Sequence, residues 1–215
     1  MITVTDLTVA YGDLVAVAEV SLQVPRGSIL AVSGPSGAGK SSLLWAIAGA
    51  VRARSGQVEV DGLAIADRQA AAAHGVVLIP QGNGLARVLT ARENLALPLL
   101  AKRTEPDVAE KYVDQALADV GLQDSGDHLV EELSGGEQQR VAVARGIAQQ
   151  GRVVLADEST SELDSTNRER VLDLLRREAD RGAAVVIATH DPTVAAAAHA
   201  HATMNEGHLT WQRPY

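Results

Sequence analysis

Cysteine is absent from the 215-residue chain, so neither a disulfide framework nor a thiolate metal site can form. Aromatic residues are also scarce: they make up 2% of the chain and include no phenylalanine. Few stacking platforms for single-stranded nucleic acid are therefore available. No apolar run approaches the roughly 18 residues that a membrane-spanning helix needs. If the protein works at a membrane, a partner must cross it.

The balance of charge narrows the range of partners further. Acidic residues outnumber basic residues by 27 to 19, which gives a net charge of −8. This balance argues against a broad phosphate-binding face, so no nucleic-acid partner is expected. Apolar residues make up 46% of the chain, which is typical of a globular protein with one good-sized core. With no secretory signature at the N-terminus, we expect a cytoplasmic location.

Short β-branched segments alternate with helical ones along the chain, which predicts an α/β fold with a mainly parallel sheet. The N-terminal alternating strands, together with residues 57–60, predict a small antiparallel sheet. Unbroken apolar runs indicate strands that are covered on both faces. These runs lie at residues 29–33, 76–79, 153–156 and 184–189.

The middle of the chain has a different pattern. Residues 90–100 and 107–120 read as helices, and no strand candidate separates them. We therefore expect one domain whose α/β core, residues 1–82 and 150–215, is interrupted by a helical lobe at residues 83–149.

The strongest motif is a P-loop between the strand at residues 29–33 and a helix expected at 41–50. Its glycines allow backbone N–H groups to surround a phosphate, and the following helix start adds positive potential. Lys40 would reach the β- and γ-phosphates of a nucleotide, and the Ser41 hydroxyl would hold Mg²⁺. A plain glycine-rich turn is the alternative. A dinucleotide fingerprint fails at Ser42, and a hydrolase nucleophile elbow fails at Ala38. The motif is Gly34-Pro35-Ser36-Gly37-Ala38-Gly39-Lys40-Ser41.

Two carboxylates, Asp157 and Glu158, end the apolar run at residues 153–156. Beside a P-loop, Asp157 would hold Mg²⁺ through a water molecule. Glu158 would polarise the attacking water as a general base. A helix or turn cap is the alternative for either carboxylate alone, and it explains the adjacent pair poorly.

A second glycine-containing segment, residues 133–140, is called here the signature segment. Ser134 and Glu137 form a capping-box pattern that predicts a helix running to about residue 149. Capping does not explain the adjacent Gly135 and Gly136, which cost helix stability. Close approach of an anion to a bare helix start does explain them. The sequence is Leu133-Ser134-Gly135-Gly136-Glu137-Gln138-Gln139-Arg140.

With this segment, the chain resembles the ATP-binding cassette ATPases over essentially its whole length. The resemblance implies ATP and Mg²⁺ as cofactors and assigns further roles. Tyr11 would stack on adenine, Gln81 would contact Mg²⁺, His190 would bond the γ-phosphate, and Asp164 would lie in a loop that crosses a dimer interface. The ATP-binding set would be Tyr11, Gly34 through Ser42, Gln81 and Asp157.

Three residues depart from the family pattern. Ser159 stands where proline is usual, Pro80 where an aromatic residue is usual, and Glu162 where alanine is usual. None of the three removes a reacting group. His199 and His201 have no apparent third ligand, so a metal site there is not expected.

By the same resemblance, two copies of the chain meet head to tail, and each signature segment faces the other copy's P-loop. ATP hydrolysis would power a separate membrane permease, which would hold the protein at the cytoplasmic face of the membrane. The segment Leu89-Thr90-Ala91-Arg92-Glu93-Asn94-Leu95-Ala96-Leu97-Pro98-Leu99 resembles the subfamily that serves lipoprotein release and macrolide export. The alternatives are a regulator of cell division at a permease-like protein and a soluble ATPase of DNA repair or translation.

Overall fold

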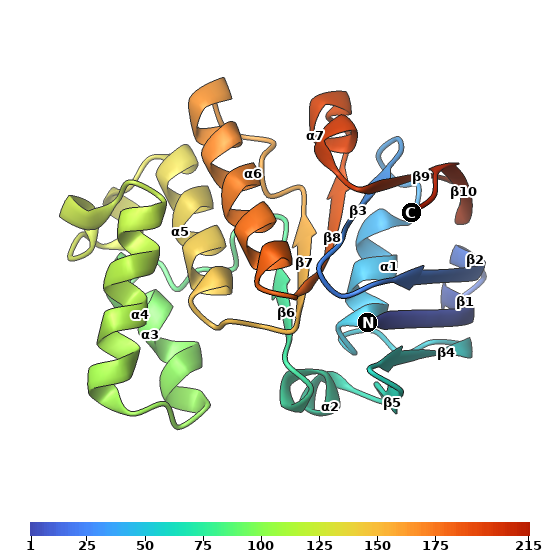
Figure 1. Ribbon diagram of the computed structural model, residues 1–215, viewed down its shortest axis with the longest axis horizontal. Helices are drawn as coiled ribbons and strands as arrows, with labels where there is room; N and C mark the ends of the chain where they lie inside the picture. Colours follow the sequence, from blue (N-terminus) through green and yellow to red (C-terminus); the bar gives the residue numbers. More distant parts are fainter.

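The computed structural model describes residues 1–215 and contains two sheets with helices around them (Figure 1). The smaller sheet is antiparallel, with strand order β2-β1-β4-β5. It confirms the small antiparallel sheet predicted from the alternating N-terminal segments. Its strands are β1 (Ile2–Tyr11), β2 (Leu14–Val24), β4 (Ser55–Val60) and β5 (Leu63–Ala64).

The larger sheet has the order β10-β9-β3-β8-β7-β6, and all its neighbouring strands are parallel except β10 and β9. It confirms the mainly parallel sheet of an α/β fold. The final hairpin, β9 and β10, was not predicted. The strands are β3 (Ile29–Ser33), β6 (Val76–Ile79), β7 (Val153–Asp157), β8 (Ala184–Thr189), β9 (Ala200–Asn205) and β10 (His208–Arg213).

Alternate residues of the central strands enter two different hydrophobic cores. Val153 and Leu155 of β7 belong to the core shared with the small sheet. Val154 and Ala156 belong to the other core, which extends to the helices on the far face. Because successive side chains of a strand point to opposite faces, a strand buried on both faces must be apolar throughout. This explains why these strands appear in the sequence as unbroken apolar runs.

Seven α-helices complete the fold. Helix α1 contacts β7 and β8 of the large sheet and β1 and β2 of the small sheet, whereas α3, α4 and α5 pack on one another and form a lobe beside β6 (Figure 1). None of the helices is both long enough and apolar enough to traverse a lipid bilayer. The helices are α1 (Lys40–Ile47), α2 (Arg68–Ala73), α3 (Ala91–Ala101), α4 (Pro106–Asp119), α5 (Gly135–Ile147), α6 (Ser165–Asp180) and α7 (Pro192–Ala197).

The helix boundaries differ from the predicted ones by a few residues. The helix expected at 41–50 ends at Ile47, because Gly49 has a φ of +64° and leaves the helical conformation. Thr90 is the N-cap of α3 and forms a capping box with Glu93. Two short 3₁₀ segments, Gln123–Ser125 and Val130–Glu132, lie between α4 and α5.

Candidate functional site

The P-loop leaves β3 at Ser33 and enters α1 at Lys40. Gly34 and Gly39 have φ values of +147° and +103°. A Cβ at Gly34 would lie 2.1 Å from the carbonyl oxygen of Met204, and one at Gly39 would lie 2.0 Å from that of Ala16. The loop is therefore clamped between β9 and β2, and only glycine fits at these two positions. Helix α1 begins without a side-chain cap, so its first N–H groups can bind an anion.

Lys40 lies across the mouth of this loop. Its side chain is buried, and its Nζ donates hydrogen bonds to the carbonyl oxygens of Gly34 at 2.8 Å and Pro35 at 3.0 Å. The same ammonium is 3.7 Å from Oε1 of Glu158. A positive charge is thus held between the P-loop and the carboxylates at the end of β7.

Ser41 and Asp157 face each other across the same space. The Ser41 hydroxyl donates a hydrogen bond of 3.0 Å to Oδ1 of Asp157. Asp157 is 0% exposed, and its Oδ2 atom has no hydrogen-bond partner. Burial raises the pKa of Asp157 above its ordinary value, although the bond from Ser41 opposes the shift. A hydroxyl beside an unpartnered buried carboxylate oxygen is a donor set that suits a hydrated divalent cation.

Glu158 has a left-handed backbone, with a φ of +49°, that turns its side chain toward the P-loop. The residue is 8% exposed. Its Oε2 atom accepts a hydrogen bond of 2.9 Å from Nδ1 of His190, which follows β8. A carboxylate held between an imidazole and an ammonium can bind and polarise a water molecule.

Lys40, Ser41, Glu158 and His190 line one cavity of about 560 Å³, called here the P-loop cavity, whereas Asp157 lies behind its wall and Gly34 and Pro35 line a neighbouring hollow. Tyr11, the last residue of β1, lies at its wall, and its hydroxyl is 3.4 Å from the Ser42 hydroxyl. The structure thus brings together the predicted residues Tyr11, Gln81, Glu158 and His190 with the loop; their chemical roles remain predictions. The lining residues are Tyr11, Leu14, Ala16, Ser36, Gly37, Ala38, Gly39, Lys40, Ser41, Ser42, Gln81, Glu158, Ser161 and His190.

The signature segment lies elsewhere, and none of residues 134–137 lines the P-loop cavity. The Ser134 side chain caps α5, and the Glu137 carboxylate accepts bonds from the Ser134 backbone N–H at 2.9 Å and hydroxyl at 2.7 Å. These bonds lower the pKa of Glu137. The capping box and the helix expected from it are therefore confirmed. Glu162 approaches this helix start, with Oε2 3.3 Å from where a Cβ of Gly135 would lie.

Asp164, predicted to lie in an interface loop, caps α6. Its carboxylate accepts bonds from the Asn167 backbone N–H at 2.8 Å and from the Asn167 side chain at 2.9 Å, and these bonds lower its pKa. The residue is exposed. Its capping role does not require a second chain, so the interface role stays a prediction.

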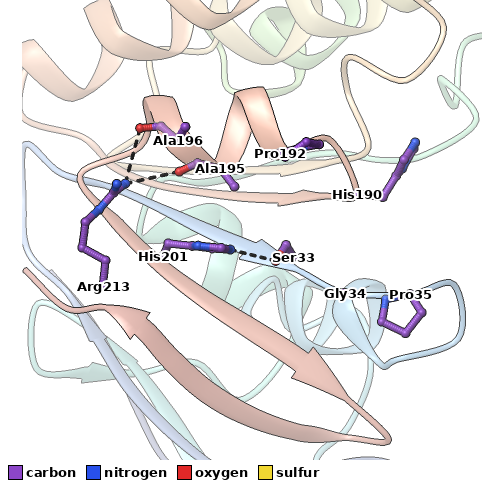
Figure 2. A pocket seen from close by; sticks show the side chains of 9 residues that line it. All are labelled: Ser33, Gly34, Pro35, His190, Pro192, Ala195, Ala196, His201 and Arg213. Atoms are coloured by element: carbon purple, nitrogen blue, oxygen red, sulfur yellow. Dashed lines mark hydrogen bonds between the residues drawn. The ribbon is translucent and has the colours of Figure 1, made fainter.

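A second hollow, called here the hairpin groove, lies beside the P-loop and has a volume of about 560 Å³ (Figure 2). In it, His201 Nε2 is 2.7 Å from the Ser33 hydroxyl. Arg213 crosses from β10 and donates to the carbonyl oxygens of Ala195 at 3.2 Å and Ala198 at 2.6 Å, at the end of α7. Burial, followed by the charge of Arg213, lowers the pKa of His201. Ser33, His201 and Arg213 bond one another or the backbone, so we assign the hairpin groove a structural role in supporting the P-loop.

Sequence reasoning missed two features of the site: the bond between Glu158 and His190 and the position of Arg168. Arg168 lies in the first turn of α6, beside the residue that follows His190. The parallel register of β7 and β8, in which Asp157 pairs with Ala188, brings both strand ends to the same edge. The sequence did contain a signal for the bond between Glu158 and His190, because each residue lies just after an apolar run that forms a strand of the same sheet.

Comparison with known proteins agrees with this geometry. The pattern of the ABC transporter family matches residues 17–161. The ABC transporter ATP-binding protein Rv2564 of Mycobacterium tuberculosis is 38% identical over 199 residues, covering 88% of this chain and 60% of that protein. The chain thus spans 60% of that relative's length. The glutamine transport ATP-binding protein GlnQ of Bacillus subtilis is 35% identical over 195 residues, covering 89% of this chain and 81% of that protein.

Solved structures agree as well. The dimeric ATP-binding cassette MJ0796, in a post-hydrolysis state with ADP and Pi, matches with a TM-score of 0.91 and 29% identity, covering 100% of both chains. The two chains therefore share one fold over their whole length. With the family pattern matched across the P-loop, the signature segment and the paired carboxylates, the chain belongs to the ABC transporter family of ATP-binding proteins.

Proposed function

We propose that the chain binds ATP in the P-loop cavity, hydrolyses it as half of a head-to-tail dimer and drives a separate membrane permease. One observation carries the proposal. The P-loop, Lys40, Glu158 and His190 share a cavity, whereas the signature segment, a second anion-binding helix start, lies outside it. A helix start that is built for a phosphate but does not face its own chain's cavity suits the phosphate of another chain.

ATP binding would use the P-loop and the side chains around the P-loop cavity. The backbone N–H groups of residues 34–42 and the Lys40 ammonium would hold the phosphates, and Tyr11 would stack on the base. Ser41 and Gln81 would hold Mg²⁺ directly, and Asp157 would hold it through water. When bound, the ion would neutralise phosphate charge. The unpartnered Oδ2 atom of Asp157 is the observation that fits such an ion.

Hydrolysis would begin at Glu158. Its carboxylate would take a proton from a water molecule as the water oxygen bonds to the γ-phosphorus and the bond to the β-phosphate oxygen breaks. Lys40 and His190, which both contact Glu158 here, would donate to the phosphate oxygens as charge develops on them. ADP and phosphate would be the products.

The dimer would complete each site with Ser134, Gly135, Gly136 and Glu137 of the second copy, and Asp164 would lie where the two copies cross. The dimeric MJ0796 structures support this arrangement. Cysteines placed at Ser36 and Gly135 test it on a chain that has no other cysteine. With Glu158→Gln present to slow hydrolysis, ATP should produce a disulfide between chains. A disulfide only within one chain, or none, would show that the signature segment does not face a partner's P-loop.

The permease would bind the helical lobe. Apolar side chains are exposed there at Val88 (76%), Leu97 (51%) and Leu100 (51%). Such a contact would place the protein at the cytoplasmic face of the membrane. Purification from detergent-solubilised membranes, followed by identification of the retained membrane protein, tests this step. Recovery of the chain without any membrane protein would favour a soluble ATPase.

An export-type permease of the lipoprotein-release kind is the finer proposal, and it rests on residues 89–99. In the structure, several of these residues have local duties: Thr90 and Glu93 cap α3, and Asn94 bonds the backbone of Ala86 at 2.8 and 3.0 Å. The name of a relative, the spermidine/putrescine import ATP-binding protein PotA of Pseudomonas aeruginosa, favours the competing assignment, an importer. ATP-driven flux measured in inside-out vesicles would separate the two, because export from the cell appears there as uptake.

A further inference from the structure

Arg168 touches two loops at once. Its Nη2 atom donates a hydrogen bond of 3.3 Å to the carbonyl oxygen of Leu163, in the loop at residues 161–164, called here the crossing loop. Its Nε atom lies 3.2 Å from Oδ2 of Asp191. Asp191 belongs to the histidine loop, defined here as residues 189–192, and directly follows His190. One side chain therefore connects the crossing loop with the segment that carries His190.

Asp191 is well suited to transmit a constraint to His190. Its Oδ1 atom accepts a bond of 2.8 Å from the Thr193 backbone N–H, and its own backbone N–H donates to the Thr189 hydroxyl at 3.0 Å. Burial raises the pKa of Asp191, but hydrogen bonds from Thr193 and the charge of Arg168 lower it to a net value below the ordinary one. The carboxylate is thus ionised, and its second oxygen faces Arg168.

The contact between Arg168 and Asp191 is close but incomplete. The Nε atom is buried, yet its N–H makes no hydrogen bond, because it is not directed at the carboxylate oxygen 3.2 Å away. A buried donor without a bond is unfavourable. A small shift of the histidine loop relative to α6 would complete the bond. His190, which in this structure bonds Glu158 at 2.9 Å, is the residue that such a shift would move.

Other arginines of α6 have no such link. Arg176 pairs with Asp173 of its own helix at 2.8 Å, and Arg177 pairs with Asp119 of α4 at 3.1 Å. Neither pair includes a residue of the crossing loop or the histidine loop. An ordinary surface ion pair contributes little to stability, so these arginines show what a substitution costs when only such a pair is lost.

We propose that Arg168 is a positioning residue for hydrolysis: through Asp191 it holds His190 in register with the crossing loop. The inference rests on the proposed function, in which the crossing loop meets the second copy. The position of that loop would then be transmitted through one guanidinium to the histidine beside Glu158. Arg168 itself would contact neither ATP nor the attacking water, since it does not line the P-loop cavity.

The test compares turnover with nucleotide affinity in Arg168→Ala, Arg168→Lys and Asp191→Asn. Phosphate release gives kcat and KM, and a fluorescent ATP analogue gives affinity. We expect Arg168→Ala to lower kcat about tenfold while affinity stays within about twofold of the wild type. Arg168→Lys keeps the positive charge but loses the forked guanidinium, so its kcat should lie between those of the wild type and Arg168→Ala. The double variant Arg168→Ala/Asp191→Asn should be no slower than the slower single variant, because the two substitutions break the same contact between Arg168 and Asp191.

Arg176→Ala is the matched control and should leave kcat unchanged. Wild-type kcat in Arg168→Ala, or multiplied losses in the double variant, would overturn the inference. An equal loss of affinity and turnover would also overturn it, because it would indicate damage to binding. If Arg168→Ala does not fold, Arg168→Lys and Asp191→Asn carry the same comparison. A wild-type protein that releases no phosphate from ATP would instead contradict the proposed function.

Discussion

Glu158 and His190, 32 positions apart in the sequence, share a hydrogen bond of 2.9 Å between Oε2 and Nδ1. Because a carboxylate can only accept, Nδ1 of the imidazole carries the proton. The other carboxylate oxygen, Oε1, is 3.7 Å from the Lys40 ammonium. The proposed general base is therefore fixed from two sides before any substrate arrives, and each of these contacts can be tested.

Replacement of Glu158 by glutamine should preserve ATP binding and lower the hydrolysis rate by about 10²–10⁴-fold, the usual contribution of a general base. The amide keeps the size of the side chain but cannot take the proton from water. Steady-state phosphate release measures the rate, and chromatographic sizing with ATP shows whether a dimer accumulates. Glu169→Gln, an exposed position on α6, is the control. A turnover number near that of the wild type would rule out Glu158 as the base.

Replacement of Lys40 by alanine should weaken both nucleotide binding and turnover. Hydrogen bonds to charged groups contribute about 1.5–3 kcal/mol each, so affinity should fall roughly tenfold to a hundredfold. Titration with a fluorescent ATP analogue checks the affinity. Lys111→Ala on the exposed face of α4 should bind as the wild type does. Equal affinities for the Lys40 variant and the wild type would mean that the loop does not hold the phosphates.

Gly39→Ala should destabilise the protein more than Gly62→Ala does. Both glycines have a positive φ, which costs an alanine about 1–2 kcal/mol. At Gly62 nothing lies within 4 Å of the added Cβ, whereas at Gly39 the Cβ would lie 2.0 Å from a backbone oxygen that cannot rotate away. Urea unfolding of both variants gives the comparison. Equal losses of stability would mean that the clamp behind the P-loop is loose.

Asp157→Asn should stabilise the nucleotide-free protein and weaken any stabilisation by Mg²⁺. The Oδ2 atom of Asp157 is buried without a partner, which costs about 1–3 kcal/mol for a polar atom and more for a charged one, and the neutral amide lowers this cost. Burial raises the pKa of Asp157 in the folded state. This group therefore favours the folded state at low pH, and its contribution is lost as the pH rises through the raised pKa. Urea midpoints measured against pH should converge for the two proteins on the acid side, and parallel curves would contradict the prediction.

Much of the fold follows from local pattern. The strands at 29–33, 76–79 and 184–189 have the predicted bounds because burial on both faces makes each of them a nearly unbroken apolar run. The hairpin β9–β10 escaped prediction because its inward residues include Ala200 and Ala202, and alanine is a weak strand former. Helix α6 was also not predicted, although the buried residues on its apolar face include Val171, Leu174 and Leu175.

The candidate site also has features that local sequence predicts and features that depend on the tertiary fold. Lys40, Ser41 and Glu158 could be identified because their motifs combine chemistry with a position at a strand end. The bond between Glu158 and His190, and the contact of Arg168 with Asp191, depend on which strands and helices are neighbours. Strand order is set by packing among distant segments, and one sequence does not display it. The capping role of Ser134 could be predicted because it involves a residue three positions away; Thr90 and Glu93 have the same spacing, and their capping box was not predicted.

The clamp behind the P-loop also bears on how the protein is made. The loop at residues 34–39 is confined by Ala16 near the start of the chain and by Met204 near its end, and Gly207 bonds the Ala38 carbonyl at 3.1 Å. A nascent chain still attached to the ribosome would carry the P-loop residues long before this rear wall emerges. The phosphate cradle would therefore become rigid only after residues 204–207 have emerged, and by then the signature helix and both carboxylates have already been synthesised.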